Sequence, residues 1–160
     1  MGYTNYWYRL ANGDSLGVFS DQQWGILTDI ARRYRDTMDH PEHGLPLLGG
    51  IDGQDKPTIN NKMIAFNGFV DLVHEPFVLY KSIHQRLSED YILSGQPDWR
   101  EQMSPPSPEG TTEYFIFCKT NEKPYDEAVW HILVNAQHMA PNHFRIANDN
   151  GIEIGSFNEK

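Results

Sequence analysis

Apolar residues recur every three or four positions in two segments, and this spacing predicts two amphipathic helices. The first follows Ser20, whose distance from Gln23 along the chain matches a capping box; its apolar positions are Trp24, Leu27, Ala31, Tyr34 and Met38. The second begins at Pro124, where a missing N–H costs nothing; its apolar positions are Tyr125, Ala128, Val129, Ile132, Leu133 and Ala136. Each helix is therefore expected to bury one stripe of side chains.

Short runs of β-branched and aromatic residues predict six strands, at 3–9, 61–67, 75–80, 113–118, 144–147 and 152–154. In the first strand, alternation places Tyr3, Asn5 and Trp7 on one face, and Thr4, Tyr6 and Tyr8 on the other. Short connections between strands favour antiparallel pairing. The last two strands flank an Asn-Gly-containing turn at 148–151, which is typical of a hairpin.

The order of elements predicts an α+β fold, a two-layer sandwich with a mostly antiparallel sheet and two amphipathic helices on one face. With 160 residues, the chain is expected to form a single domain over 1–160. The segment 81–112 contains four of the chain's ten prolines and two of its glycines. It is expected to be a long loop, and such loops serve as lids or partner surfaces or are partly disordered.

Composition narrows the classes of function. Thirteen basic and 22 acidic residues give a net charge of −9, which opposes a broad electrostatic grip on nucleic-acid backbone. A single cysteine, Cys118, cannot form an intramolecular disulfide and fits a reducing compartment. No apolar run approaches the 18 residues that a membrane span needs. We therefore expect a cytoplasmic protein with no membrane partner, and we expect edge strands that are compatible with a homo-oligomer.

The junction between the fourth strand and the second helix suggests an anion site. Lys119 and Lys123 flank a segment that leads into a helix N-terminus, where backbone amides favour phosphate or carboxylate, and Thr120 adds a hydroxyl donor. The alternative is that Thr120 or Asn121 caps the helix and that the lysines are solvated. An aromatic ring on the open face of the first strand would supply a stacking surface for a base. The predicted ligand-binding residues are Tyr3, Thr4, Tyr6, Asn67, Lys119, Thr120, Lys123 and Tyr125.

Four acidic or imidazole side chains are candidates for general acid–base chemistry: Asp71, His74, Glu75 and Asp126. Strand alternation would point His74 and Glu75 apart, and no metal-binding motif is present, so neither a metal nor a cofactor is expected. The second helix carries one polar stripe, Glu127, His131, Asn135 and His138, which is more typical of a solvated face than of a site. Cys118 in mid-strand is expected to be buried and not to act as a nucleophile.

Three stretches resemble a family of small conserved proteins of tailed bacteriophages and prophages. They are Met1-Gly-Tyr-Thr-Asn-Tyr-Trp7, then Phe66-Asn-Gly68 with His74-Glu75-Pro-Phe77, and finally Phe117-Cys-Lys-Thr120 with Lys123-Pro-Tyr-Asp126. The resemblance implies a setting in the host bacterial cytoplasm and does not imply an activity.

Three hypotheses follow from the residues and this setting. The first is a phage-encoded small-ligand-binding protein that sequesters a nucleotide-type host defence signal. The alternative is a nucleotide hydrolase or phosphoesterase that uses the acid–base candidates. The second alternative is an effector that binds a host protein through its acidic surface and the 81–112 segment.

Overall fold

The computed structural model describes residues 3–12, 18–38, 45–82 and 111–155. The long loop predicted at 81–112 therefore lies outside the described residues, except for its two ends. The fold has two long helices and two antiparallel sheets, and it is α+β as predicted. Within the described part of the chain, no helix has the length and apolar character needed to cross a bilayer.

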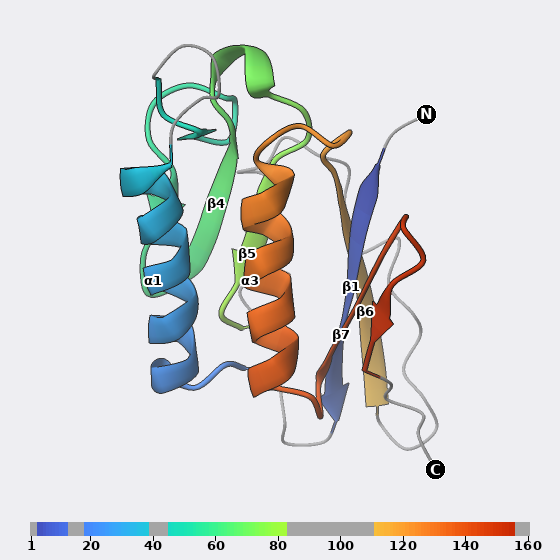
Figure 1. The fold of residues 1–160 in the computed structure, drawn as a ribbon. Helices are drawn as coiled ribbons and strands as arrows, with labels where there is room; N and C mark the ends of the chain where they lie inside the picture. Colours follow the sequence, from blue (N-terminus) through green and yellow to red (C-terminus); the bar gives the residue numbers. More distant parts are fainter. Residues whose placement is uncertain (1–2, 13–17, 39–44, 83–110, 156–160) are drawn as a thin grey trace.

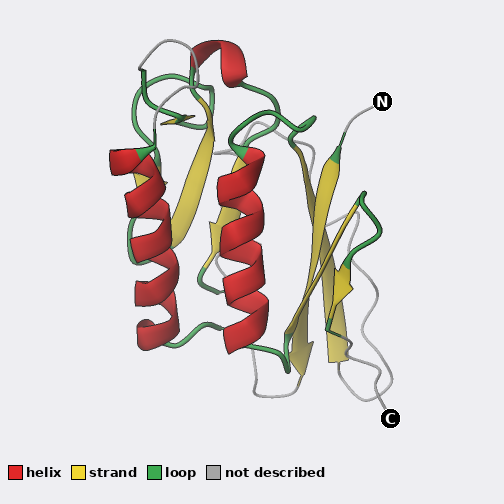
Figure 2. Ribbon diagram, in the orientation of Figure 1, coloured by secondary structure: helices red, strands yellow, loops and turns green. Residues whose placement is uncertain are grey.

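Both predicted helices form, and both lie on the same side of the strands (Figures 1 and 2). Helix α1 spans Asp21–Thr37 and α3 spans Asp126–Met139. The capping box predicted at the start of α1 is confirmed, because the Ser20 hydroxyl accepts from the Gln23 amide at 3.1 Å and the Gln23 side chain accepts from the Ser20 amide at 2.9 Å. The two helices run side by side and cover the core as one layer.

The first sheet has the strand order β6-β1-β7-β8, with every neighbouring pair antiparallel. Its strands are β1 (Thr4–Asn12), β6 (Thr111–Lys119), β7 (Phe144–Asn148) and β8 (Glu153–Ile154). Strand β1 lies in the interior of the sheet, where Trp7 is opposite Ile116 on one side and Ile146 on the other. The first strand of the chain therefore holds together two strands from its second half.

The second sheet is smaller and is built around β4. Its strands are β2 (Leu48–Gly49), β3 (Thr58–Ile59), β4 (Met63–Gly68) and β5 (Phe77–Tyr80), and a 3-10 turn, η1 (Val70–Leu72), connects the last two. The sequence pattern predicts one sheet, and the structure has two. Strands β2 and β3 are not predicted, since they lie in a segment whose sequence has no regular pattern. Each is only two residues long and is defined by its pairing with β4.

The two sheets share one hydrophobic core, and polar contacts from β1 join the first sheet to the second. Trp7 of the first sheet packs on Phe77 of the second, with ring centroids 5.3 Å apart. The Arg9 side chain, 1% exposed, donates to the carbonyl oxygens of Tyr80 and, at 3.2 Å, Lys81. The described residues thus form one packed body over which both helices lie.

Candidate functional site

Most of the residues predicted to bind a ligand lie at one end of the first sheet. There the beginning of β1, the end of β6 and the beginning of α3 meet, because the amides of Thr120 and Asn121 donate to the Tyr3 carbonyl at 2.9 and 3.1 Å. The Tyr125 hydroxyl donates to the Glu75 carbonyl at 2.5 Å, and the Lys119 amide donates to a Glu75 carboxylate oxygen at 2.8 Å. Most of the predicted set is therefore brought together in space.

Two carboxylates organise this end of the sheet. One carboxylate oxygen of Asp126 accepts hydrogen bonds from the side-chain nitrogen of Asn5 and from the Thr120 hydroxyl, both at 2.6 Å. Asp149 accepts from the Thr4 amide at 2.9 Å and from the Tyr6 hydroxyl at 2.8 Å. The hydroxyl and amide donors of this region are thus engaged with carboxylates and carbonyl groups of the protein itself.

The backbone amides at the start of α3 are engaged as well. The amide of Asp126 donates to the Lys123 carbonyl at 2.8 Å, that of Glu127 to Pro124 at 3.3 Å, and that of Ala128 to Tyr125 at 3.0 Å. The pKa of Tyr3 is raised by burial and by the nearby carboxylates Asp126, Glu122 and Asp149. An anion would therefore meet acidic neighbours and amides that already have partners, and the anion-binding role of Lys119, Thr120 and Lys123 stays a prediction.

The acid–base candidates before β5 do not form a cluster with metal-binding geometry. Asp71 and His74 are exposed, and the described part of the chain contains no group of three His, Cys, Asp or Glu side chains that could hold a metal ion. Asn67 braces this loop: its amide nitrogen donates to the carbonyls of Ile51 and His74, and its oxygen accepts from the amides of Gly68 and His74. The predicted ligand residue Asn67 thus has a structural role.

The alternation predicted for the first strand appears in its burial. Asn5 and Trp7 are buried toward the core, whereas Tyr6 and Tyr8 lie half-buried on the opposite face and pack on Phe115, with centroids 5.8 and 5.0 Å apart. Thr4 departs from the pattern because it is buried. The prediction that Cys118 is buried is confirmed, and burial raises its pKa well above the usual range, which leaves the thiol poorly suited to nucleophilic chemistry.

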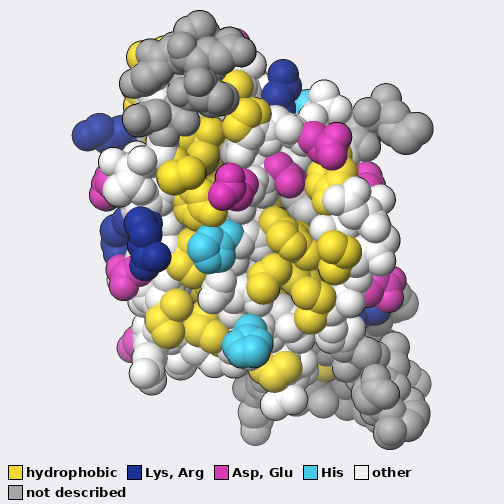
Figure 3. Space-filling view, in the orientation of Figure 1, with side chains coloured by type: hydrophobic (Ala, Val, Ile, Leu, Met, Phe, Trp, Pro, Cys, Tyr) yellow, Lys and Arg dark blue, Asp and Glu magenta, His cyan; other side chains and the backbone are white. Residues whose placement is uncertain are grey.

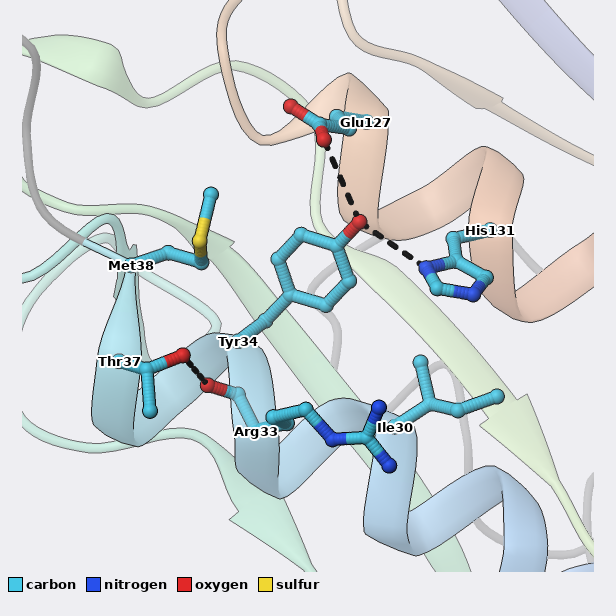
Figure 4. A pocket seen from close by; sticks show the side chains of 7 residues that line it. All are labelled: Ile30, Arg33, Tyr34, Thr37, Met38, Glu127 and His131. Carbon is cyan, nitrogen blue, oxygen red and sulfur yellow. Dashed lines mark hydrogen bonds between the residues drawn. The ribbon is translucent and has the colours of Figure 1, made fainter.

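A pocket that the sequence does not predict lies between α1 and α3 (Figure 4). Its volume is about 190 Å³, and the residues that line it are Ile30, Arg33, Tyr34, Thr37 and Met38 of α1 with its C-cap, and Glu127 and His131 of α3. The space-filling view shows apolar side chains gathered over the two helices, with histidine and acidic side chains among them (Figure 3). The pocket thus opens on the face that the helices form.

Tyr34 is the centre of the pocket's polar side. Its hydroxyl oxygen lies 3.0 Å from His131 Nδ1 and 3.5 Å from Glu127 Oε2, and Figure 4 shows the hydroxyl between these two side chains of α3. The Tyr34 ring stands edge-on to the imidazole, at an interplanar angle of 85°. Burial and the Glu127 carboxylate raise the pKa of Tyr34, so its phenol keeps its proton at neutral pH.

The proton on Tyr34 permits two arrangements with His131. When Tyr34 donates to His131 Nδ1, the neutral imidazole carries its proton on Nε2. When His131 donates from Nδ1 to the Tyr34 oxygen, the phenol donates onward to Glu127. Either arrangement fixes the imidazole ring by one hydrogen bond and leaves Nε2 without a hydrogen-bond partner among the described residues.

Sequence reasoning missed this pocket for a physical reason. Tyr34 is expected in the buried stripe of the first helix, and Glu127 and His131 are expected in the solvated stripe of the second. The pocket forms only where the edges of the two stripes meet. The one available signal is the spacing of Glu127 and His131, which are four positions apart and so share a helix face.

Comparison of the chain with protein-family models, with curated proteins and with solved structures finds no match. The resemblance to a bacteriophage family therefore stays a prediction, and the function has to be argued from the site itself.

Proposed function

We propose that the protein binds a small molecule in the pocket between α1 and α3. The observation that carries this proposal is an apolar pocket with a hydrogen-bonded polar rim, built by side chains of two helices. Pockets with apolar walls and a few convergent polar groups are the usual form of ligand sites, and positions between helices are among their common locations.

The size of the pocket limits what can fill it. A cavity of about 150 Å³ accommodates benzene, so a pocket of about 190 Å³ accommodates one ring or a short aliphatic chain with a polar head. Ile30 and Met38 offer apolar contact, and the Tyr34 ring offers a flat surface. Larger molecules would place one ring-sized part in the pocket and extend along the exposed helix face.

Nucleotides remain within this proposal. A nucleobase has the planar shape that the pocket accepts, and Arg33 at its rim supplies a cation for a phosphate. The expected role of sequestering a nucleotide-type signal in a bacterial host is supported by this fit and by the resemblance described above. A mononucleotide is therefore part of the first ligand screen.

The hydrolase alternative has one observation in its favour. Tyr34, His131 and Glu127 form a hydrogen-bonded series in which a proton can be held or passed, as general acid–base catalysis requires. Because the same pocket would hold the substrate, binding and turnover are distinguished by what is recovered after mixing.

The test is a binding screen by saturation-transfer NMR with mono-, di- and cyclic nucleotides and with small aromatic acids, amines and amides. Thr37→Phe places a ring in the pocket and is expected to weaken the affinity for any ligand found in the screen at least tenfold. Gln22→Phe introduces the same side chain at an exposed position in the first turn of α1, outside the pocket, and should leave the affinity unchanged. Heat denaturation should release an unchanged ligand; a new product instead would favour the hydrolase. A hit that ignores Thr37→Phe would place the site elsewhere.

A further inference from the structure

The pocket contains two opposite charges that are not paired with each other. Arg33 of α1 and Glu127 of α3 both line it and both are exposed. Within the described ranges, neither takes part in a salt bridge, and Glu127 has only the 3.5 Å contact with the Tyr34 hydroxyl. By contrast, Arg35 of the same helix is bonded to Asp36 at 2.7 Å. A cation and an anion thus face one cavity and remain available to a ligand.

The two charges lie at different ends of the pocket. Figure 4 shows the Glu127 carboxylate beyond the hydroxyl end of Tyr34, while the Arg33 guanidinium extends beside Ile30 on the opposite side. The Tyr34 ring lies between them. A ligand that spans the pocket would therefore meet an acceptor at one end, an apolar middle and a charged donor at the other end.

We propose that the ligand is a dipolar molecule of single-ring size, with an ammonium or similar cationic donor toward Glu127 and an acidic group toward Arg33. This inference rests on the proposed function, since it names the chemical class that the same pocket prefers. His131, whose Nδ1 lies 3.0 Å from the Tyr34 hydroxyl, is a further polar side chain that lines the pocket. α-Amino acids with a ring-sized side chain belong to this class.

Selectivity for this class has an electrostatic cause. A ligand with only a positive charge pairs with Glu127 but places its apolar part against Arg33, which then has no counter-charge. A ligand with only a negative charge pairs with Arg33 and leaves Glu127 without a counter-charge. Binding partly dehydrates both charges of the pocket, so each one left without a counterpart lowers the affinity. A dipolar ligand compensates both.

The experiment compares four probes of similar size on the full chain by ligand-observed NMR titration: phenylalanine, 2-phenylethylamine, 3-phenylpropionate and 3-phenylpropanamide. Phenylalanine is expected to bind about tenfold more tightly than either singly charged probe. Arg33→Gln should weaken phenylalanine and 3-phenylpropionate and spare the amine, and Glu127→Gln should weaken phenylalanine and the amine and spare the acid. Arg35→Gln, which removes the same charge from the same helix outside this pocket, should change none of them.

Two other outcomes separate this inference from the proposed function. If the amine, the acid or the amide binds as tightly as phenylalanine and loses its binding in Thr37→Phe, the proposal of a dipolar ligand is wrong, and the pocket remains a binding site. If all four probes fail while another compound of the wider screen is lost in Thr37→Phe, the class is again wrong. If no compound responds to Thr37→Phe, both proposals fail.

Discussion

At the scale of single residues, the notable positions are polar side chains that are buried or half-buried in the fold. Asn5 is fully buried; its amide reaches Asp126, and its side-chain oxygen has no partner in the described part of the molecule. His143 packs edge-on to Phe19 at 5.8 Å, close to Arg9, whose guanidinium lies 4.9 Å from the same ring. Because the imidazole of His143 titrates, its position ties the stability of the fold to protonation.

His143 should make folding stability depend on pH in mildly acidic solution. Burial and the charge of Arg9 lower its pKa below the usual 6.5, so the unfolded chain takes up the proton first. Its contribution is therefore complete above about pH 6.5 and is lost as the pH falls toward the folded-state pKa. We expect His143→Gln, measured by urea unfolding between pH 7.5 and 5, to flatten this slope, which for one group is at most about 1.4 kcal/mol per pH unit. His138→Gln, an exposed imidazole on α3, is the control; equal slopes in both variants would contradict the prediction.

At the scale of elements, the capping residues at the N-terminus of α1 also contact the second helix. Ser20 and Gln23 exchange hydrogen bonds before the first turn, and the Gln23 side-chain nitrogen also donates to the Met139 carbonyl at the end of α3, at 3.0 Å. The cap therefore both starts α1 and holds it beside the second helix.

Ser20→Ala should destabilise the protein by about 1 kcal/mol, because the Gln23 amide loses its acceptor. For a chain of this length, the melting temperature should fall by about 2–4 °C, as measured by circular dichroism. Ser20→Asp retains an acceptor and should keep the stability of the unchanged protein. An equal loss in both variants would show that something other than the cap is affected.

Elements with a regular hydrophobic pattern or a capping motif of their own could be predicted from the sequence. Elements that form only by pairing with another strand could not. Both helices and the longer strands follow from periodicity and capping. Strands β2 and β3 have two residues each and exist because β4 offers a hydrogen-bonding edge on either side. The candidate site follows the same rule: the pattern places Tyr34 and His131 on their own helices, but only packing brings Tyr34 within 3.0 Å of His131.

At the scale of the whole molecule, Arg9 is the link between the two sheets. It is buried in β1, lies over Phe19 and Phe144, and donates to two carbonyls at the end of β5. A guanidinium can satisfy several acceptors at once, which a hydrocarbon of the same volume cannot do.

Arg9→Met should therefore cost about 2–4 kcal/mol, since it keeps most of the packing and leaves the carbonyls of Tyr80 and Lys81 without this donor. Hydrogen exchange should show faster opening of amides in both sheets. Arg9→Lys, which retains a charge and a donor, is expected to lose less. A Met variant within 0.5 kcal/mol of the unchanged protein would contradict this role for Arg9.

The position of β1 inside the first sheet also sets the order in which the molecule can be assembled. Its partner residues are far away along the chain: Asn12 pairs with Thr111 and Asn5 with Asn148. During synthesis at about 5–20 residues per second, β1 waits several seconds or longer before its first partner emerges. Refolding must likewise close a loop of about a hundred residues before β1 gains a partner in that sheet, which slows a chain of this size. An aromatic strand that waits unpaired for so long is where this protein would most need protection from aggregation.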